Sequence, residues 1–156
     1  MNAPSKRSER LGEIGLQNFT PYLMNRIIER YNENLRTDLV KAGMTTPKIR
    51  AMAVLSVVDG LLIGELAIYA VVEKSTMSRT LDKLEAEGAV RREIDLGDQR
   101  ATRIFITDSG RATFEQIWPA MAENYAAMFR DIPEDERAAF VSTLQKILRN
   151  IRRHEL

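Results

Sequence analysis

Short hydroxyl and basic side chains gather between residues 73 and 83, and their chemistry suits noncovalent contact with nucleic acid. Hydroxyl groups bind phosphate oxygens or base edges, and an arginine can bind O6 and N7 of guanine with two hydrogen bonds. The alternative is a solvated helix surface on which Arg79 pairs with Asp82. Lys83 would pair with Glu87 in the same way. The candidate contact residues are Ser75, Thr76, Ser78, Arg79 and Lys83.

A second charged group lies in the segment LGDQRA, which contains Asp98 and Arg100. An arginine at a narrow hairpin tip can enter the minor groove of DNA, where A·T-rich sequence gives a strongly negative potential. Unpaired, Asp98 would repel phosphate, so we expect it to orient an arginine through charge-assisted hydrogen bonds. An ordinary charged hairpin tip is the alternative. For three further arginines, backbone contact and solubilising charge beside a sheet are equally favoured: Arg91, Arg92 and Arg103.

The first group requires a helix to present it. Met77, Leu81 and Leu84 follow one another at spacings of four and three, which places them on one apolar helix face. Ser75, Arg79, Asp82 and Ala86 fall on the opposite face, and Gly88 ends the helix. The spacing therefore predicts an amphipathic helix whose short polar face suits a DNA major groove.

The second group requires a hairpin. Side chains alternate along residues 90–95 and again along residues 102–106, which predicts two short strands. Gly97 provides the bend between them. A helix followed by a charged hairpin is the arrangement of a winged helix.

These segments resemble the signature region of the MarR family of winged-helix transcription regulators. The resemblance is carried by KSTMSRTLDKLEAEGAVRR, by the hairpin DLGDQRA with its Asp-x-Arg pattern, and by IFITDSGR; it extends back through TTPKIRAMAVL and GELA. It implies a mainly α fold, a winged helix-turn-helix with a two-stranded β-hairpin wing and long N- and C-terminal dimerisation helices. One departure is that Leu62 or Ile63 stands where the family has Ser or Thr, so we expect that helix to begin loosely.

The chain outside this region is predicted to be helical. Thr20-Pro21 and Thr46-Pro47 are helix-start signals, with the threonine as cap and the proline in the first turn. Thr107 is expected to cap a long helix that Pro119 kinks near residues 115–119. A last helix follows Pro133.

We expect one domain preceded by a flexible basic tail at residues 1–10. Within residues 11–156, the winged helix-turn-helix core spans 45–106, and dimerisation helices span 11–43 and 107–153. The long helices carry more apolar surface than one small domain can cover, which predicts a homodimer. A two-fold dimer places its recognition helices about one DNA turn apart, roughly 10 bp, and so requires a palindromic operator in double-stranded DNA.

Composition excludes several other functions. Net charge is +1, from 23 basic and 22 acidic residues, and residues 73–103 hold seven of each, so DNA affinity has to come from where the charges lie. Without cysteine and with His154 as the one histidine, metal and thiol chemistry are not expected, and no cofactor is predicted. The N-terminus has no secretory signal, and the longest apolar window is twelve residues, which is short of the ~20 that span a bilayer. A cytoplasmic location without membrane contact is expected.

The leading hypothesis is a dimeric, sequence-specific DNA-binding regulator, a repressor released by a small ligand. The resemblance implies an aromatic or phenolic effector in the crevice between the dimerisation helices and the winged helix. Tyr31, Met52, Phe114 and Trp118 are interpreted as core packing, with lining of that crevice as the alternative. A winged helix used only for protein contact is the second hypothesis. Catalysis is not expected, because the chain has no phosphate-binding glycine motif and no nucleophile paired with a base.

Overall fold

The structure, a computed structural model, describes residues 9–155, so most of the tail predicted at residues 1–10 lies outside the described residues. Short helical turns come first, followed by six longer helices and a small sheet. In chain order the elements are α1 (Leu11–Ile14), η1 (Leu16–Asn18), α2 (Thr20–Lys41), α3 (Thr46–Val57), β1 (Leu61–Leu62), α4 (Ile63–Ala70), α5 (Lys74–Ala86), β2 (Val90–Ile94), β3 (Thr102–Ile106), α6 (Asp108–Met128) and α7 (Glu134–Ile151).

The sheet has three antiparallel strands in the order β1-β3-β2, one more than the two-stranded hairpin that the sequence predicted. Strands β2 and β3 form the hairpin, in a register that pairs Val90 with Ile106 and Ile94 with Thr102. The added strand β1 pairs Leu61 with Ile104. Two residues are too few for an alternating pattern to show, which is why β1 escaped the sequence analysis.

One continuous apolar core joins the helix-turn-helix to the sheet. Met77, Leu81 and Leu84 of α5 have no exposed surface, which confirms the predicted inner face of this helix. They lie in the same core as Leu55 of α3 and Ile104 of β3. Burial of this face fixes the rotation of α5 about its own axis and so determines which side chains point outward.

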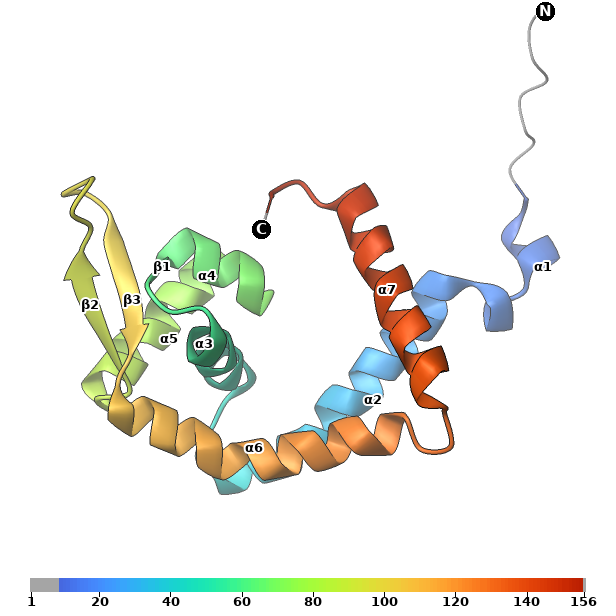
Figure 1. Cartoon of the computed structure of the whole chain (residues 1–156), viewed down its shortest axis with the longest axis horizontal. Coiled ribbons are helices and arrows are strands. Elements are labelled where there is room, and N and C mark those ends of the chain that lie inside the picture. The colour runs from blue at the N-terminus through green and yellow to red at the C-terminus, as the bar shows by residue number, and fades with distance from the viewer. Residues whose placement is uncertain (1–8, 156) are drawn as a thin grey trace, which may run out of the picture.

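The long helices extend away from the winged domain (Figure 1). Helix α6 runs from the sheet to the far end of the molecule, where α2 and α7 lie, and its ribbon bends along its length, as expected from Pro119 within it. The inner half of α2 is packed, with Leu35 and Leu39 buried, whereas Ile27 is exposed. In α7 no residue is buried.

Hydrogen bonds at the helix starts correct two of the predicted caps. Thr20 and Thr46 are the first helical residues, and Phe19 and Thr45 are the cap positions. The Thr45 hydroxyl accepts a bond from the Lys48 amide at 3.4 Å. The Thr107 cap is confirmed, because its hydroxyl accepts a bond from the Gly110 amide at 3.0 Å.

Helix α4 begins without a side-chain cap at Leu62, in keeping with the expected departure from the family pattern. The Glu65 carboxylate instead accepts a hydrogen bond from the Leu62 amide at 2.9 Å. At the other end of α4, Val71 adopts a left-handed conformation with φ of 52°. Such a conformation is strained for a β-branched residue. Val71 thereby forms the tight turn that joins the two helices of the helix-turn-helix.

Within residues 9–155, no helix is long and apolar enough to cross a membrane.

Candidate nucleic-acid interface

The polar side chains predicted for nucleic-acid contact lie on the outer surface of α5. Ser75, Arg79 and Lys83 are exposed, and Thr76 and Ser78 are partly exposed at the edge of the same face. Asp82 and Ala86 are exposed as predicted, and Thr80 is buried with the apolar residues. The structure thus brings the five candidates of the first group together on one face.

The carboxylate of Glu73 caps the beginning of α5. It accepts hydrogen bonds from the amides of Ser75 at 3.2 Å and Thr76 at 3.1 Å, and from the Ser75 hydroxyl. These bonds lower the pKa of Glu73 to about 2, with the bond from the Ser75 hydroxyl as the largest cause. The sequence analysis missed this cap, because Ser, Thr, Asp and Asn are the usual N-cap residues and glutamate is not.

Arg79 and Lys83 make no ion pair within residues 9–155. The Arg79 guanidinium donates only to the Thr76 hydroxyl, at 3.3 Å, and Asp82 is bound elsewhere. Glu87, the alternative partner of Lys83, is paired with Lys48 of α3. The alternative of a helix surface neutralised by these two pairs is therefore wrong, and both cations face outward.

The tip of the wing is shaped by a backbone contact of Asp98. Its carboxylate accepts a hydrogen bond from the Arg100 amide at 2.9 Å, and its carbonyl accepts one from the Ala101 amide at 2.9 Å. The expectation that Asp98 orients a guanidinium is wrong: it closes the turn from which Arg100 projects. The exposed Arg100 and Lys74, at the start of α5, line one hollow of about 410 Å³ beside the first turn of α4.

Two of the three remaining arginines connect the wing to other elements, and Arg91 is engaged within the hairpin. Arg92 donates to Asp82 at 2.8 Å and to Glu85 at 2.6 Å. Burial opposes its charge, but the bonds to Asp82 and the attraction of Glu85 outweigh that effect and raise the pKa of Arg92. Arg103 donates to the Gly60 carbonyl at 2.8 Å and to Asp95 at 3.3 Å.

Arg91 lies over the Phe105 ring, 4.4 Å from its centre, and pairs with Glu93. All three arginines therefore have intramolecular partners, so none of them is a free solubilising charge, and their contact with the DNA backbone stays a prediction.

Acidic and basic side chains of residues 73–103 differ in how many have partners, even though the segment holds equal numbers of acids and bases. Every acid in the segment has a partner: Glu73 and Asp98 accept amide hydrogen bonds, and Asp82, Glu85, Glu87, Glu93 and Asp95 are in ion pairs. Within the described part of the chain, four bases of the segment have no ion pair: Lys74, Arg79, Lys83 and Arg100. The cations of this segment that lack an ion pair therefore lie on α5 and the wing tip, whereas the two carboxylates without a cation partner, Glu73 and Asp98, are held by backbone amides.

A helix-turn-helix followed by a sheet with a projecting hairpin defines the winged-helix class of proteins. Comparison with known proteins places the chain within that class. The sequence model of the MarR family matches residues 44–102. A crystal structure of a MarR-family transcriptional regulator from Silicibacter pomeroyi is 53% identical, covers 95% of this chain and all of that one, and superposes with a TM-score of 0.90. The chain belongs to the MarR family of transcription regulators.

Two more distant relatives have more specific descriptions. The HTH-type transcriptional repressor IacR of Pseudomonas putida is 22% identical over 89% of this chain and 83% of its own length. The transcriptional repressor CouR, solved with a 23-mer DNA duplex, is 23% identical, covers 90% of this chain and 99% of its own, and has a TM-score of 0.72. CouR comes from Rhodococcus jostii. At this identity the likeness to CouR concerns the fold.

Proposed function

We propose that this protein is a dimeric, sequence-specific DNA-binding repressor that a small aromatic or phenolic ligand releases from its operator. Helix α5 would enter the major groove, and the wing would place Arg100 in the adjacent minor groove. The DNA-contact set is the one predicted from the sequence, with a changed role for Asp98, which holds the turn beneath Arg100. No catalysis is involved, and the DNA target implies a cytoplasmic site of action.

The separation of charge carries this proposal. An even composition gives no general attraction to DNA, so affinity depends on where unpaired cations lie. Lys74, Arg79, Lys83 and Arg100 lie on α5 and the wing, the two elements that contact DNA in a winged helix. Five of their seven acidic neighbours are in ion pairs within the chain, which weakens the repulsion of phosphate that unpaired carboxylates would cause.

Exposed apolar side chains on the terminal helices support the dimer. Ile27 of α2 and Leu148 and Ile151 of α7 are exposed by 48%, 59% and 71%. A monomer would present this apolar surface to water, and a second copy would bury it. Two-fold symmetry would then present two copies of α5 to successive turns of DNA.

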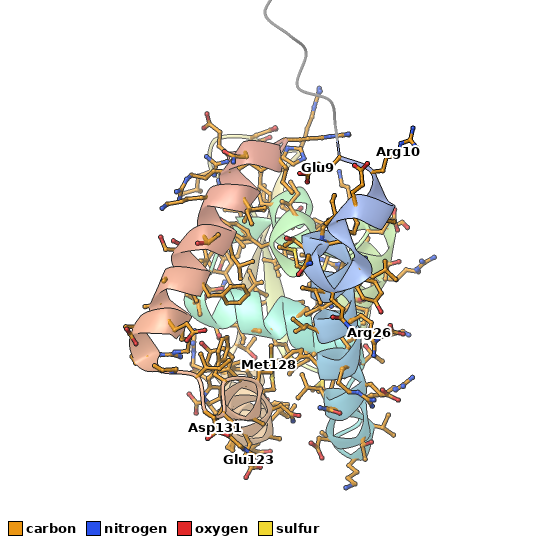
Figure 2. All side chains as sticks on the ribbon, turned by 90° about the vertical axis from the view of Figure 1, so that its right-hand side faces the viewer. Glu9, Arg10, Arg26, Glu123, Met128 and Asp131 are labelled. Atoms are coloured by element: carbon orange, nitrogen blue, oxygen red, sulfur yellow. The ribbon has the colours of Figure 1, made fainter. Side chains whose placement is uncertain are left out.

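A hollow of about 580 Å³ lies between α2, the end of α6 and α7. Tyr31, Phe129 and Phe140 give it aromatic walls, and Arg26 lies at its edge. Figure 2 looks along this end of the molecule, with Met128 between the helices and Arg26 on α2. A ligand that binds one arrangement of these helices better than another would shift the balance between two spacings of the α5 helices, and the difference in its binding free energy sets the size of that shift.

Phe114 and Met52 lie in the core, as the sequence analysis expected, with exposed fractions of 8% and 0%. The same expectation is wrong for Trp118, which is 52% exposed and lines a second hollow, between α3 and α6. Exposed Trp118 provides an intrinsic fluorescent reporter for ligand titrations.

Selection of bound sites from a random DNA pool tests the proposal directly. We expect a palindromic motif with half-sites about 10 bp apart and a steep fall of affinity with salt, because neutralised phosphates release their counterions. A winged helix that binds only proteins would select no motif. A DNA affinity that does not change with salt concentration would likewise contradict DNA binding through α5 and the wing.

The Arg100→Ala variant tests the wing contact. We expect affinity for the selected operator to fall about tenfold while the melting temperature stays unchanged, because Arg100 is exposed and makes no ion pair within residues 9–155. Arg36→Ala removes the same charge from an exposed position on α2 and serves as the control. Equal affinity of Arg100→Ala and the wild type would remove the wing from the DNA interface.

A further inference from the structure

Arg92 connects the wing to the recognition helix through two ion pairs. Its guanidinium reaches from β2 to Asp82 and Glu85, which lie one turn apart on the outer face of α5. The Arg92 side chain is 24% exposed, so its two bonds are partly shielded from water. A planar guanidinium with fixed donors can bind two carboxylates at once and thereby hold both position and direction.

The other polar attachments of the wing lead elsewhere. Arg103 is bonded to the Gly60 carbonyl, and the Ile106 amide donates to Asp59 at 2.9 Å, so both connect β3 to the turn before β1. Arg91 is engaged with Phe105 and Glu93 within the hairpin. Among residues 9–155, no other side-chain hydrogen bond or ion pair joins β2 or β3 to α5.

Because Arg92 lies near the base of the hairpin, a small rotation there moves the wing tip by a larger distance. The hairpin continues for about five residues beyond Arg92, which is roughly 17 Å at the rise of an extended strand. A rotation of about 10° at its base would displace the tip by about 3 Å, comparable to the length of a hydrogen bond. The angle between wing and helix therefore decides whether Arg100 reaches the minor groove while α5 lies in the major groove.

We propose that Arg92 is a positioning residue for DNA recognition, which fixes the wing against α5 so that the two grooves are contacted together. This inference rests on the proposed function, and Arg92 itself does not touch DNA. It also forms ion pairs with two carboxylates on the helix face that approaches phosphate, and it offsets one of their two negative charges. The same guanidinium thus joins the hairpin to α5 and holds both carboxylates in ion pairs.

A double-mutant cycle on the full chain measures this role. The operator affinity of wild type, Arg92→Ala, Arg100→Ala and the double variant is compared by fluorescence anisotropy. In the wild-type background we expect Arg100→Ala to weaken binding about tenfold, and in the Arg92→Ala background less than about threefold, because a misplaced wing gains little from its arginine. Equal penalties in both backgrounds would overturn the inference.

Two further variants separate positioning from charge. Arg91→Ala removes one positive charge from the neighbouring residue of the same strand, and we expect it to leave the Arg100 penalty near tenfold. Arg92→Lys keeps the charge but cannot bind both carboxylates in a planar fork. In the Arg92→Lys background we therefore expect the loss of affinity caused by Arg100→Ala to return only in part. An Arg92→Lys variant with no recovery over Arg92→Ala would contradict the role assigned to the two ion pairs.

Spin-label distances test the geometry without DNA. The chain has no cysteine, so Gln99→Cys at the wing and Ala86→Cys at the exposed end of α5 give one pair of labels in each chain, and dilution with unlabelled chain isolates that pair within a dimer. We expect the distance distribution to broaden when Arg92→Ala is added and to stay narrow with Arg91→Ala. An unchanged distribution with Arg92→Ala would overturn the inference even where operator binding is normal, and a chain that selects no DNA would instead defeat the proposed function.

Discussion

At the scale of single residues, the beginning of α5 depends on one carboxylate. Glu73 accepts hydrogen bonds from two amides that would otherwise lack partners, and it places a negative charge at the positive end of the helix dipole. It also engages the hydroxyl of Ser75, one of the predicted DNA contacts. In the free protein this hydroxyl donates to Glu73, so it has to change partner before it can donate to DNA.

Protonation of Glu73 is expected to destabilise the fold. Its folded pKa of about 2 lies below the ordinary value of 4.5, so its stabilising contribution is present above pH 4.5 and is lost as the pH falls toward 2. Glu73→Gln keeps a carbonyl oxygen as acceptor and removes the titration. As the pH is lowered from 5 to about 2, the melting temperature should therefore fall less steeply for Glu73→Gln than for wild type.

Other carboxylates of the chain also titrate in this pH range. Asp95 and Glu134 also have lowered pKa values, chiefly through hydrogen bonds from Arg103 and Arg137, and they contribute equally to both proteins. If the melting temperatures of wild type and Glu73→Gln fall equally with pH, the stabilisation by this cap does not depend on the charge of Glu73.

At the scale of elements, the end of the wing is joined to α6 by close backbone contact. The Thr107 hydroxyl donates to the Gly88 carbonyl at 2.6 Å, and the Thr107 amide donates to the Ala89 carbonyl at 3.0 Å. Gly110, in the first turn of α6, lies against Ala89 so closely that an added Cβ would stand 2.0 Å from that carbonyl oxygen. The glycine is required by this approach of α6 to the residue before β2, and it belongs to the segment IFITDSGR that carried the resemblance.

We predict that Gly110→Ala lowers the free energy of unfolding by roughly 1–3 kcal/mol, because the new methyl group can fit only if α6 shifts away from Ala89. Chemical denaturation provides the measurement. Gly64→Ala, in the first turn of α4, is the matched control, since nothing lies within 4 Å of its added Cβ. We expect the control to be neutral or to stabilise by up to about 1 kcal/mol. Equal effects of the two substitutions would contradict the close packing at Gly110.

Much of this element structure was predictable, because it depends on local pattern. Helix α5, strands β2 and β3, and the Thr107 cap follow from periodicity and capping chemistry within a few residues. The short strand β1 was not predictable, since Leu61 and Leu62 become a strand only through pairing with β3. The partners of Asp82 and Glu87 differ from those of the alternative interpretation for the same reason: Arg92 and Lys48 are ten and thirty-nine positions away in sequence.

At the scale of the whole molecule, α6 separates the winged domain from the terminal helices (Figure 1). Helix α7 follows the turn at Asp131. None of its residues is buried, and apolar side chains are exposed along its length. One copy of the chain leaves this end incomplete. DNA binding is therefore predicted to depend on a second copy, although α5 and the wing are complete in one.

Leu148→Glu is expected to prevent dimerisation, because it would bury a charge against the partner. Light scattering should report a single chain mass, and operator affinity should fall by at least about a hundredfold through loss of the second half-site. Val57→Glu at the end of α3 makes a similar change at a side chain that is 83% exposed, outside the terminal helices. The control should remain dimeric. A dimeric Leu148→Glu variant would place the interface elsewhere.

The sequence by itself determined the long helices, strands β2 and β3 and the buried face of α5, because periodicity and capping act over a few neighbouring positions. It also indicated nucleic acid as the partner, through the polar face of α5 and the resemblance to the MarR family. The tertiary structure alone decided which charges remain free. Arg92 and Arg103 look no different from Arg79 and Arg100 along the chain, yet the first two have carboxylate partners brought to them by folding and the other two face outward without one. Ion pairs form between groups that are close in space, and that proximity is a property of the packed molecule.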